Sequence, residues 1–390
     1  MVSSLAQTAG SGPILIVDLS RNFGGVDVRV IDVARGLHGL RPYAVAVLRD
    51  SLIHQRLAAL NLNVLPIDVS RGDPRMLMAL LREIRKGRYV VVDAHNPQSQ
   101  FWGLMAAFIA RVPGRISSVH TPYSVTPGGL KGWLYSQVLR LNGLWGCTYM
   151  TVSKSIASYL SSLGVKHSDI ALIYNGVYVT AGPVRSGQSL RRELQLEDSD
   201  YVVAVVARLE RQKGHDFLLK SLPTVIAQYP QVRVLIVGDG RLREALERQA
   251  EALGIRDYVA FTGFRKDVHD ILAISDAFCL PSRAEGLPFA LLEASMHQLP
   301  LLLSDVDGMG EWFTHKQTAY LFPPGDVYAL ADGLQWLIGH PDEASSMGLQ
   351  AHEFVQMRLN PETMISETLA LYDRVSVTAH DQRSSHFAAT

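Results

Sequence analysis

Short apolar runs rich in β-branched residues alternate along the chain with segments whose apolar residues recur at helical spacing. In the first half this pattern predicts strands near 13–18, 43–48, 63–69, 89–94, 115–119, 147–152 and 170–174, and helices near 26–39, 51–60, 74–86, 98–111, 130–143 and 154–163. In the second half it predicts strands near 201–206, 232–237, 258–262, 277–280, 299–303 and 319–322, and helices near 215–228, 241–253, 267–274, 287–297, 326–339 and 361–376. Strands and helices in regular alternation favour parallel sheets with helices on both faces.

The pattern is interrupted near 178–200, where small residues and a proline precede a charged stretch. We therefore expect a linker with one short helix there. The chain of 390 residues is long enough for two α/β domains, which we place at 1–178 and 179–360. The terminal segments 1–12 and 377–390 are expected to be disordered.

The net charge of zero hides an asymmetry between the two halves. Residues 1–180 carry 18 Lys and Arg against 9 Asp and Glu, whereas residues 181–390 carry 19 against 28. The basic half favours an anionic partner such as a phospholipid surface or a lipid phosphate, although drift of solvated surface charge would give the same imbalance. Within it, the segment 128–145 combines Trp133, Trp145, Lys131 and Arg140. Such a segment either contacts an anionic membrane surface or forms a buried helix of the first sheet.

Other features of the sequence limit the cellular compartment and the kinds of partner that we expect. No apolar run reaches 18 residues, and the start of the chain is not typical of a signal peptide. Cys147 and Cys279 lie far apart in the sequence, so a disulfide is not expected. We expect a cytoplasmic protein, peripheral on the inner face of the cell membrane if the basic half binds lipid, and no nucleic-acid partner.

Ligands of open parallel sheets bind beyond the carboxyl ends of the strands, so the residues that follow each predicted strand are candidates for chemistry. The segment 281–294, Pro-Ser-Arg-Ala-Glu-Gly-Leu-Pro-Phe-Ala-Leu-Leu-Glu-Ala, follows one strand. Gly286 permits a tight turn, Pro288 suits a first helical turn, and the amides there can receive phosphate or sugar oxygens. Glu285 and Glu293 lie about 12 Å apart along a helix, too far for a close carboxylate pair. They are either ligand-binding or ordinary helix glutamates.

Three further segments follow predicted strands. Arg208 and Lys213 are two cations that can face a diphosphate, although such a pair is more often solvated. The turn at Gly238 and the Gly24–Gly25 pair each open a helix. Without Gly-x-Gly-x-x-Gly, no dinucleotide cofactor is indicated. Asp305 and Asp307 lack a third ligand, so we expect no metal site.

The segment with Glu285 and Glu293 closely resembles the retaining glycosyltransferases of family 4, which have the GT-B fold. Residues 206–214 look like that family's Gly-Arg-Leu-x-x-x-Lys-Gly loop, with Ala207 in place of the usual glycine. The resemblance implies two Rossmann-like domains whose parallel sheets face each other across a cleft. It also implies that 1–178 binds the acceptor, that 179–360 binds the donor, and that a C-terminal helix within 361–390 crosses back to the first domain.

The resemblance carries roles to individual residues. Arg208 and Lys213 are expected to hold the donor diphosphate, Glu285 the donor sugar and Glu293 the ribose hydroxyls. Gly24, Gly25, Gly238, Gly286, Leu287 and Pro288 are expected to line the donor site. His120 is similar to a histidine in the family's Thr-x-His pattern, and His95 and Asn96 lie on the same acceptor side. Tyr178 departs from the family's Asn-Gly-Val-Asp at the domain junction, where the hinge contacts are expected to differ.

The reaction implied is transfer of a glycosyl group from a nucleoside diphosphate sugar, most often a UDP-sugar, with retention of configuration. The acceptor would be a glycan or a lipid-linked sugar in the synthesis of a cell-surface polysaccharide or glycolipid. No cofactor or metal ion is expected beyond the nucleotide sugar. A sugar-nucleotide epimerase of the same fold and a non-catalytic nucleotide-sugar-binding protein remain as alternatives.

Overall fold

The computed structural model describes residues 12–21, 23–70, 72–124, 129–177, 186–306 and 309–387, with side chains as far as Val377. The chain divides into two compact units. The first combines the chain up to Asn175 with the segment that begins at Pro361, and the second is Gly176–Asn360.

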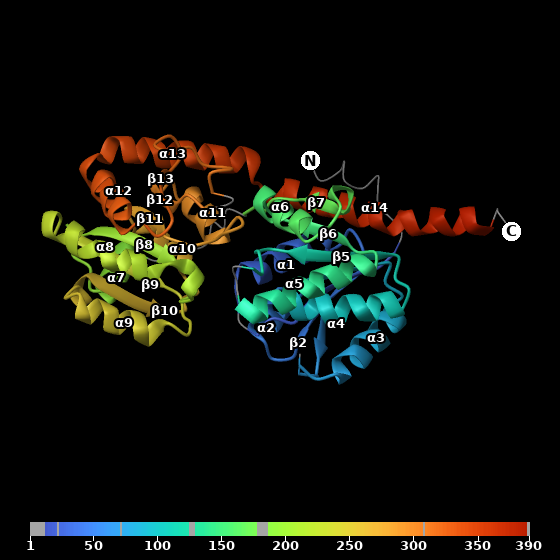
Figure 1. The fold of residues 1–390 in the computed structure, drawn as a ribbon. Coiled ribbons are helices and arrows are strands. Elements are labelled where there is room, and N and C mark those ends of the chain that lie inside the picture. Colours follow the sequence, from blue (N-terminus) through green and yellow to red (C-terminus); the bar gives the residue numbers. More distant parts are fainter. Residues whose placement is uncertain are drawn as a thin grey trace. The chain divides into compact units, whose positions relative to one another are not determined.

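The first unit is built on a seven-stranded sheet with strand order β3-β2-β1-β4-β5-β6-β7. All of its strand pairs are parallel. Its strands are β1 Ile14–Asp18, β2 Tyr43–Leu48, β3 Val64–Ile67, β4 Val91–His95, β5 Gly114–Val119, β6 Thr148–Thr151 and β7 Ile170–Leu172. Its helices are α1 Gly25–Leu37, α2 Leu52–Ala59, α3 Arg75–Gly87, α4 Asn96–Ile109, α5 Gly129–Leu144, α6 Lys154–Ser162, the 3-10 turn η2 His167–Asp169 and α14 Pro361–Phe387 (Figure 1).

The second unit has a six-stranded parallel sheet in the order β10-β9-β8-β11-β12-β13. Its strands are β8 Tyr201–Val206, β9 Val232–Val237, β10 Val259–Gly263, β11 Ala277–Leu280, β12 Leu301–Ser304 and β13 Tyr320–Phe322. Its helices are α7 Gly187–Glu193, α8 His215–Gln228, α9 Arg243–Ala252, α10 Val268–Ala273, α11 Phe289–Met296, α12 Val327–Gly339 and α13 Pro341–Arg358, with the 3-10 turns η3 Arg211–Lys213 and η4 Arg256–Tyr258.

The strand pattern explains both sheets. The central strands are buried along their whole length, as in β1 and β4 of the first unit and β11 and β12 of the second. A parallel sheet needs such continuous apolar strands because helices cover both of its faces. Every predicted strand is present, and the predicted pair of α/β domains with parallel sheets is confirmed.

Helix α13, Pro341–Arg358, was not predicted. Its buried face consists of Ala344, Met347, Gly348, Ala351 and Val355. These positions have helical spacing, but three of the five residues are alanine or glycine, so the apolar signal in the sequence is weak. The small residues serve close packing, since a Cβ atom at Gly348 would lie 2.2 Å from the carbonyl oxygen of Gln298.

Helix α14 is longer than predicted. It continues to Phe387, so the expectation of disorder from residue 377 is wrong for 377–387. The helix packs on the first unit: Arg41 forms an ion pair of 2.5 Å with Asp373, and the hydroxyl of Tyr372 donates to Asp93 at 2.7 Å. The apolar pattern of the sequence ends near residue 377, because the residues from Thr378 to His386 are polar or small.

Both cysteines are buried and unpaired, as predicted. Burial raises the pKa of Cys147 to about 12 and that of Cys279 above the ordinary range of a thiol. Neither side chain therefore ionises near neutral pH.

Candidate active site

Two loops of the second unit come together at the carboxyl ends of their strands. The first follows β8 and ends at Gly214, and the second follows β11. Gly214 has a φ of +66°, and a Cβ atom there would lie 1.9 Å from the carbonyl oxygen of Pro281. Only glycine combines this backbone conformation with so close an approach. The family-like Lys-Gly pair in the sequence is thus explained by contact between the two loops.

Lys213 and Glu285 form the central contact between these loops. The Lys213 ammonium lies 2.5 Å from Oε1 of Glu285, whose side chain is only 4% exposed. The hydroxyl of Ser282 donates to the same oxygen at 2.6 Å. Ser304 of β12 in turn donates to the carbonyl oxygen of Ser282 at 2.6 Å. Two predicted site residues therefore form one buried ion pair, supported by hydrogen bonds from the neighbouring strand.

A second set of contacts, which the sequence did not indicate, fastens the same loops. Arg283 pairs with Asp216 through two hydrogen bonds of 2.8 Å and stacks on Phe217, with the guanidinium carbon 3.8 Å from the ring centroid. Gln212 donates to the carbonyl oxygen of Ala284 at 2.7 Å. A bidentate pair of this kind fixes geometry as well as charge. No local pattern signals it, because its partners are 67 residues apart.

Arg208 lies in the same loop as Lys213 but differs in environment. Its side chain is exposed, whereas that of Lys213 is 15% exposed. The Arg208 segment is held by the neighbouring turn, since Gly238 has a φ of +138° and a Cβ atom there would lie 2.1 Å from the carbonyl oxygen of Ala207. The loop thus presents the exposed guanidinium of Arg208, whereas the ammonium of Lys213 is paired.

Helix α11 begins directly after the Glu285 loop. Pro288 is its N-cap residue, and its side chain makes no capping hydrogen bond. Gly286 and Leu287 are buried in the turn before it. Glu293 is half-buried in the helix. The uncapped first turn leaves backbone amides that suit an anionic or sugar oxygen.

His215 opens helix α8 beside Lys213. It is 1% exposed, and within the described chain neither of its ring nitrogens has a hydrogen-bond partner. Burial lowers its pKa to about 4, and the positive charge of Lys213 adds to that effect. The ring is therefore neutral at physiological pH, so the positive charge of this loop resides on Arg208, Arg211 and Lys213.

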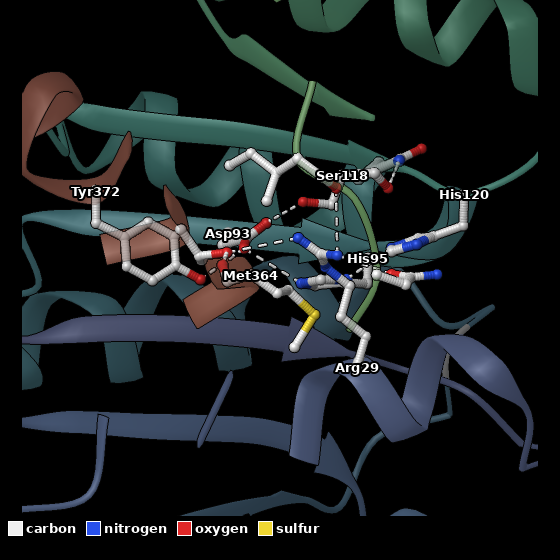
Figure 2. Close-up of polar contacts among 11 residues, drawn as sticks. Arg29, Asp93, His95, Ser118, His120, Met364 and Tyr372 are labelled. Carbon is white, nitrogen blue, oxygen red and sulfur yellow. Dashed lines mark hydrogen bonds and ion pairs between the residues drawn. The ribbon is translucent and has the colours of Figure 1, made fainter. Parts of the chain in front are cut away.

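The candidate residues of the first unit centre on two histidines at adjacent strand ends (Figure 2). Nδ1 of His95 lies 2.9 Å from Nε2 of His120, and the rings stack with centroids 5.2 Å apart. Nε2 of His95 lies 3.2 Å from Oδ2 of Asp93. The structure thus joins both predicted histidines into a chain that ends on a buried carboxylate.

Asp93 is held from two further directions. The hydroxyl of Ser118 donates to Oδ1 at 2.5 Å and that of Tyr372 to Oδ2 at 2.7 Å. Burial alone would raise the pKa of Asp93, but His95 and these hydrogen bonds outweigh it and hold the pKa below its usual value. Burial holds the pKa of His120 well below its usual value, with smaller contributions from His95 and Arg29. Asp93 is therefore ionised and His120 neutral at physiological pH.

The sequence analysis gave no role to Asp93, Tyr372 or Arg29. The carboxylate of Asp93, between the apolar run Val90–Val92 and Ala94, was a usable signal, because a buried charge needs partners. Arg29 is fully buried in α1, where its Nη1 donates to Oδ1 of Asn175 at 2.7 Å, and burial lowers its pKa to about 10. Tyr372 arrives from α14, 279 residues away from Asp93, so no local pattern could have indicated it.

Asn96 and the Gly24–Gly25 pair have local partners. Asn96 has a φ of 64° and donates to Oδ1 of Asp18 at 2.7 Å. Gly24 is the N-cap of α1, and its amide donates to Oδ2 of Asp27 at 2.8 Å. The start of α1 therefore already carries a carboxylate, which weakens it as a site for a second anion.

Among the described residues, no three His, Cys, Asp or Glu side chains are grouped as a metal ion would require. Asp305 is exposed, and Asp307 lies outside the described residues, as does Tyr178 at the domain junction.

The arrangement of two parallel α/β units matches glycosyltransferases of the GT-B fold. The structure of HepE from Anabaena in complex with UDP-glucose superposes with a TM-score of 0.81 over 92% of this chain and 98% of HepE, at 22% identity. The protein is thus a two-domain, Rossmann-like GT-B protein.

The family follows from the sequence profiles. The profile of the group 1 glycosyl transferases matches residues 187–354, and that of Glycosyltransferase Family 4 matches residues 23–180. The chain belongs to this family of glycosyltransferases.

Two curated relatives illustrate the range of similar proteins. The UDP-Gal:alpha-D-GlcNAc-diphosphoundecaprenol alpha-1,3-galactosyltransferase of Escherichia coli is 27% identical over 67% of this chain and 70% of its own length. The lipopolysaccharide core biosynthesis glycosyltransferase LpsD of Rhizobium meliloti is 28% identical over 58% of this chain and 64% of its own.

Proposed function

We propose that the protein transfers a sugar from a UDP-sugar to a glycan or lipid-linked acceptor with retention of configuration, in the synthesis of a cell-surface polysaccharide or glycolipid. The observation that carries this proposal is the buried contact between Lys213 and Glu285, which joins the two family-like loops at the carboxyl ends of β8 and β11. The UDP-glucose complex of HepE and the UDP-galactose-dependent relative support the choice of donor.

Each residue receives a separate task in this proposal. Arg208 and Lys213 stabilise the departing diphosphate, whose negative charge grows in the transition state. Glu285 orients the donor sugar through its second carboxylate oxygen, and Glu293 binds the ribose hydroxyls. Glu285 is engaged by Lys213 and Ser282, so it is a binding carboxylate and not one half of a glycosidase-type pair. Gly286, Leu287 and Pro288, with the backbone amides at the start of α11, complete the donor site.

A donor screen tests this proposal. The protein is incubated with UDP-, GDP- and ADP-sugars, and release of the free nucleoside diphosphate is measured with and without candidate acceptors. We expect release from a UDP-sugar and a product whose anomeric proton has the donor's configuration by NMR. An inverted product would refute retention, an isomerised sugar nucleotide would indicate an epimerase, and binding without any release would indicate a non-catalytic protein.

We predict that activity needs no divalent cation. The positive charge of Arg208 and Lys213 can take the place that a metal ion has in other nucleotide-sugar enzymes. The test is turnover after treatment with a chelator, with Mg²⁺ and Mn²⁺ added back. Loss of activity that either ion restores would contradict the prediction.

The proposal includes association with the inner face of an anionic membrane through α5, Gly129–Leu144. The buried face of this helix has one large apolar residue, Leu139, and is otherwise small or polar, with Gly132, Ser136 and Asn142. Five of its apolar side chains point outward, at positions that share one face. Their exposed fractions are 75% for Leu130, 57% for Trp133, 50% for Leu134, 38% for Leu141 and 80% for Leu144. The alternative that Trp133 is a core residue is therefore wrong, whereas Trp145 does pack on the core.

The charge of the surrounding chain is complementary to an anionic surface. Between Asp93 and Asp169 the sequence contains no acidic residue, where the average of 37 in 390 would give about seven. The same stretch contains six cations: Arg111, Arg115, Lys131, Arg140, Lys154 and Lys166. Each cation close to an anionic bilayer contributes about 1 kcal/mol, so a few suffice for reversible association.

The apolar face also extends beyond α5. Phe108 at the end of α4 stacks on Trp145 with centroids 6.3 Å apart, and Phe108 and Ile109 are both exposed. On the other side, an open groove of about 400 Å³ lies between α5 and α6, lined by Trp133, Gln137, Arg140 and Tyr159 among others. Aromatic and cationic side chains around one groove suit the interfacial region of a bilayer. Within the described chain, no helix is long and apolar enough to cross a membrane.

We predict salt-sensitive binding to anionic vesicles. The protein is sedimented with vesicles of phosphatidylcholine alone and with vesicles that also contain phosphatidylglycerol. Binding to the anionic vesicles should weaken as salt shortens the Debye length below about 10 Å. The variant Trp133→Ser with Arg140→Glu should lose it, whereas the matched variant Met78→Ser with Arg82→Glu, which changes the same chemistry on α3, should retain it. Equal binding to both vesicle types, or to neither, would refute the membrane proposal and leave the transferase proposal intact.

A further inference from the structure

The hydrogen-bonded chain of Asp93, His95 and His120 determines which ring nitrogen of His120 carries a proton. Ionised Asp93 can only accept, so Nε2 of His95, 3.2 Å away, is a donor. When His95 is neutral, its Nδ1 is then an acceptor, and His120 must donate to it from Nε2 across the 2.9 Å contact. Nδ1 of His120 is left as a lone pair. Within the described chain that atom has no hydrogen-bond partner, and the His120 ring is half-buried at the end of β5.

We propose that Asp93, His95 and Tyr372 are positioning residues that make Nδ1 of His120 a hydrogen-bond acceptor for a sugar hydroxyl. The inference rests on the proposed function, because it assumes that a sugar substrate of the transferase binds beside His120. It goes further by giving a role to a carboxylate, a buried histidine and a tyrosine of α14 that do not themselves contact substrate. Figure 2 shows the four side chains converging from β4, β5 and α14.

The same chain predicts a switch on protonation. If the histidine pair takes up one proton, His95 becomes a cation that donates from both nitrogens. His120 then accepts at Nε2 and carries its own proton on Nδ1, which can no longer accept from a hydroxyl. Activity is therefore present above the apparent pKa of the pair and is lost as the pH falls through it.

The charged groups around the pair come from four elements. Asp93 on β4 favours the cation, and Arg29 on α1 opposes it. Asp18 on β1 lies beside His95 but receives its hydrogen bonds from Ser20 and Asn96, and burial raises its pKa. Tyr372 on α14 is neutral, because burial raises its pKa well above the usual value. Asp93 is thus the charged group in direct contact with the two histidines. The hydrogen bond from Tyr372 weakens the effect of this negative charge on them.

Two substitutions should move the titration in opposite directions. Asp93→Asn removes the anion, so the apparent pKa of the pair should fall by about 1–3 units. The new amide group can also donate to Nε2 of His95. His95 would then donate to His120, whose proton would move to Nδ1. Nδ1 could no longer accept from the sugar hydroxyl, and the loss of this hydrogen bond should lower kcat/KM about tenfold. Tyr372→Phe leaves the full charge on Asp93, so the pKa should rise by a smaller amount. Asp18→Asn, a matched change at the neighbouring strand end, should move it far less than Asp93→Asn.

The experiment follows the histidine ring nitrogens of the full-length, substrate-free protein by ¹⁵N NMR across a pH titration, and then the pH profile of kcat/KM. His120→Gln assigns the resonances. Opposite pKa shifts in Asp93→Asn and Tyr372→Phe, with a change of His120 tautomer in Asp93→Asn, would support the proposal. Unmoved pKa values, shifts of the same sign, or an equal shift in Asp18→Asn would overturn it. Because the titration needs no turnover, its failure is distinguishable from failure of the transferase proposal.

Discussion

Replacing Arg208 with alanine should lower kcat by about 10² to 10³, equivalent to roughly 3–4 kcal/mol of transition-state stabilisation. The expected loss is large because Arg208 is an exposed cation directly after β8, whereas Lys213 is already paired with Glu285. Its guanidinium can hold two oxygens of a diphosphate at once, and the negative charge there grows as the glycosidic bond breaks.

Arg211 provides the matched control for this prediction. It lies three residues away, is also exposed, and contacts Arg283 only through its backbone carbonyl oxygen. Arg211→Ala therefore removes the same charge from the same loop and should change kcat by no more than about twofold. Turnover of a UDP-sugar and the affinity for UDP are measured for both variants, with circular dichroism as the check of folding. Equal losses in the two variants would show that only the general charge of the loop matters.

The fold was predictable because its strands carry the signal by themselves. Continuous apolar runs such as Val202–Val205 describe strands buried on both faces, and glycines after strands mark the turns. The prediction failed where packing depends on small residues. Helix α13 buries alanines and a glycine, and at Gly348 it packs too closely for a Cβ atom, so side-chain hydrophobicity gives no signal there.

The candidate site divides in the same way. Glu285 and Lys213 lie in loops whose sequences resemble the family, so their importance could be predicted. Their direct contact could not be predicted, because 72 residues separate them. Asp93 was visible as a charge in an apolar strand, but its partner Tyr372 comes from a helix at the other end of the chain. Sequence spacing reports local geometry, whereas ion pairs and hydrogen bonds between distant segments depend on the folded topology.

The outward face of α5 shows a third limit. Helical spacing of leucines and tryptophans in the sequence fits a core helix and a membrane-facing helix equally well. The residues that pack against the other face of the helix decide between these two interpretations. A Cβ atom at Gly132 would lie 2.1 Å from the carbonyl oxygen of Tyr123, so the face with the small residues is the one that packs on the protein.

A double-mutant cycle on the Lys213–Glu285 pair should separate its structural role from its catalytic one. Lys213→Met leaves a buried carboxylate that is 4% exposed and unpaired by any cation, which should lower the free energy of unfolding by about 3–5 kcal/mol. Glu285→Gln should cost less, since Lys213 is 15% exposed and its ammonium can reach water.

The double variant Lys213→Met with Glu285→Gln removes both charges, so its stability should return close to that of the wild type. Its kcat should nevertheless stay about 10² to 10³ below the wild type, because the cation for the diphosphate and the carboxylate for the donor sugar are both missing. Unfolding in urea gives the stabilities, and release of UDP gives the rates. If the double variant regained turnover together with stability, the pair would only fasten the two loops, and the diphosphate would be held by Arg208 and the backbone amides at the start of α11 alone.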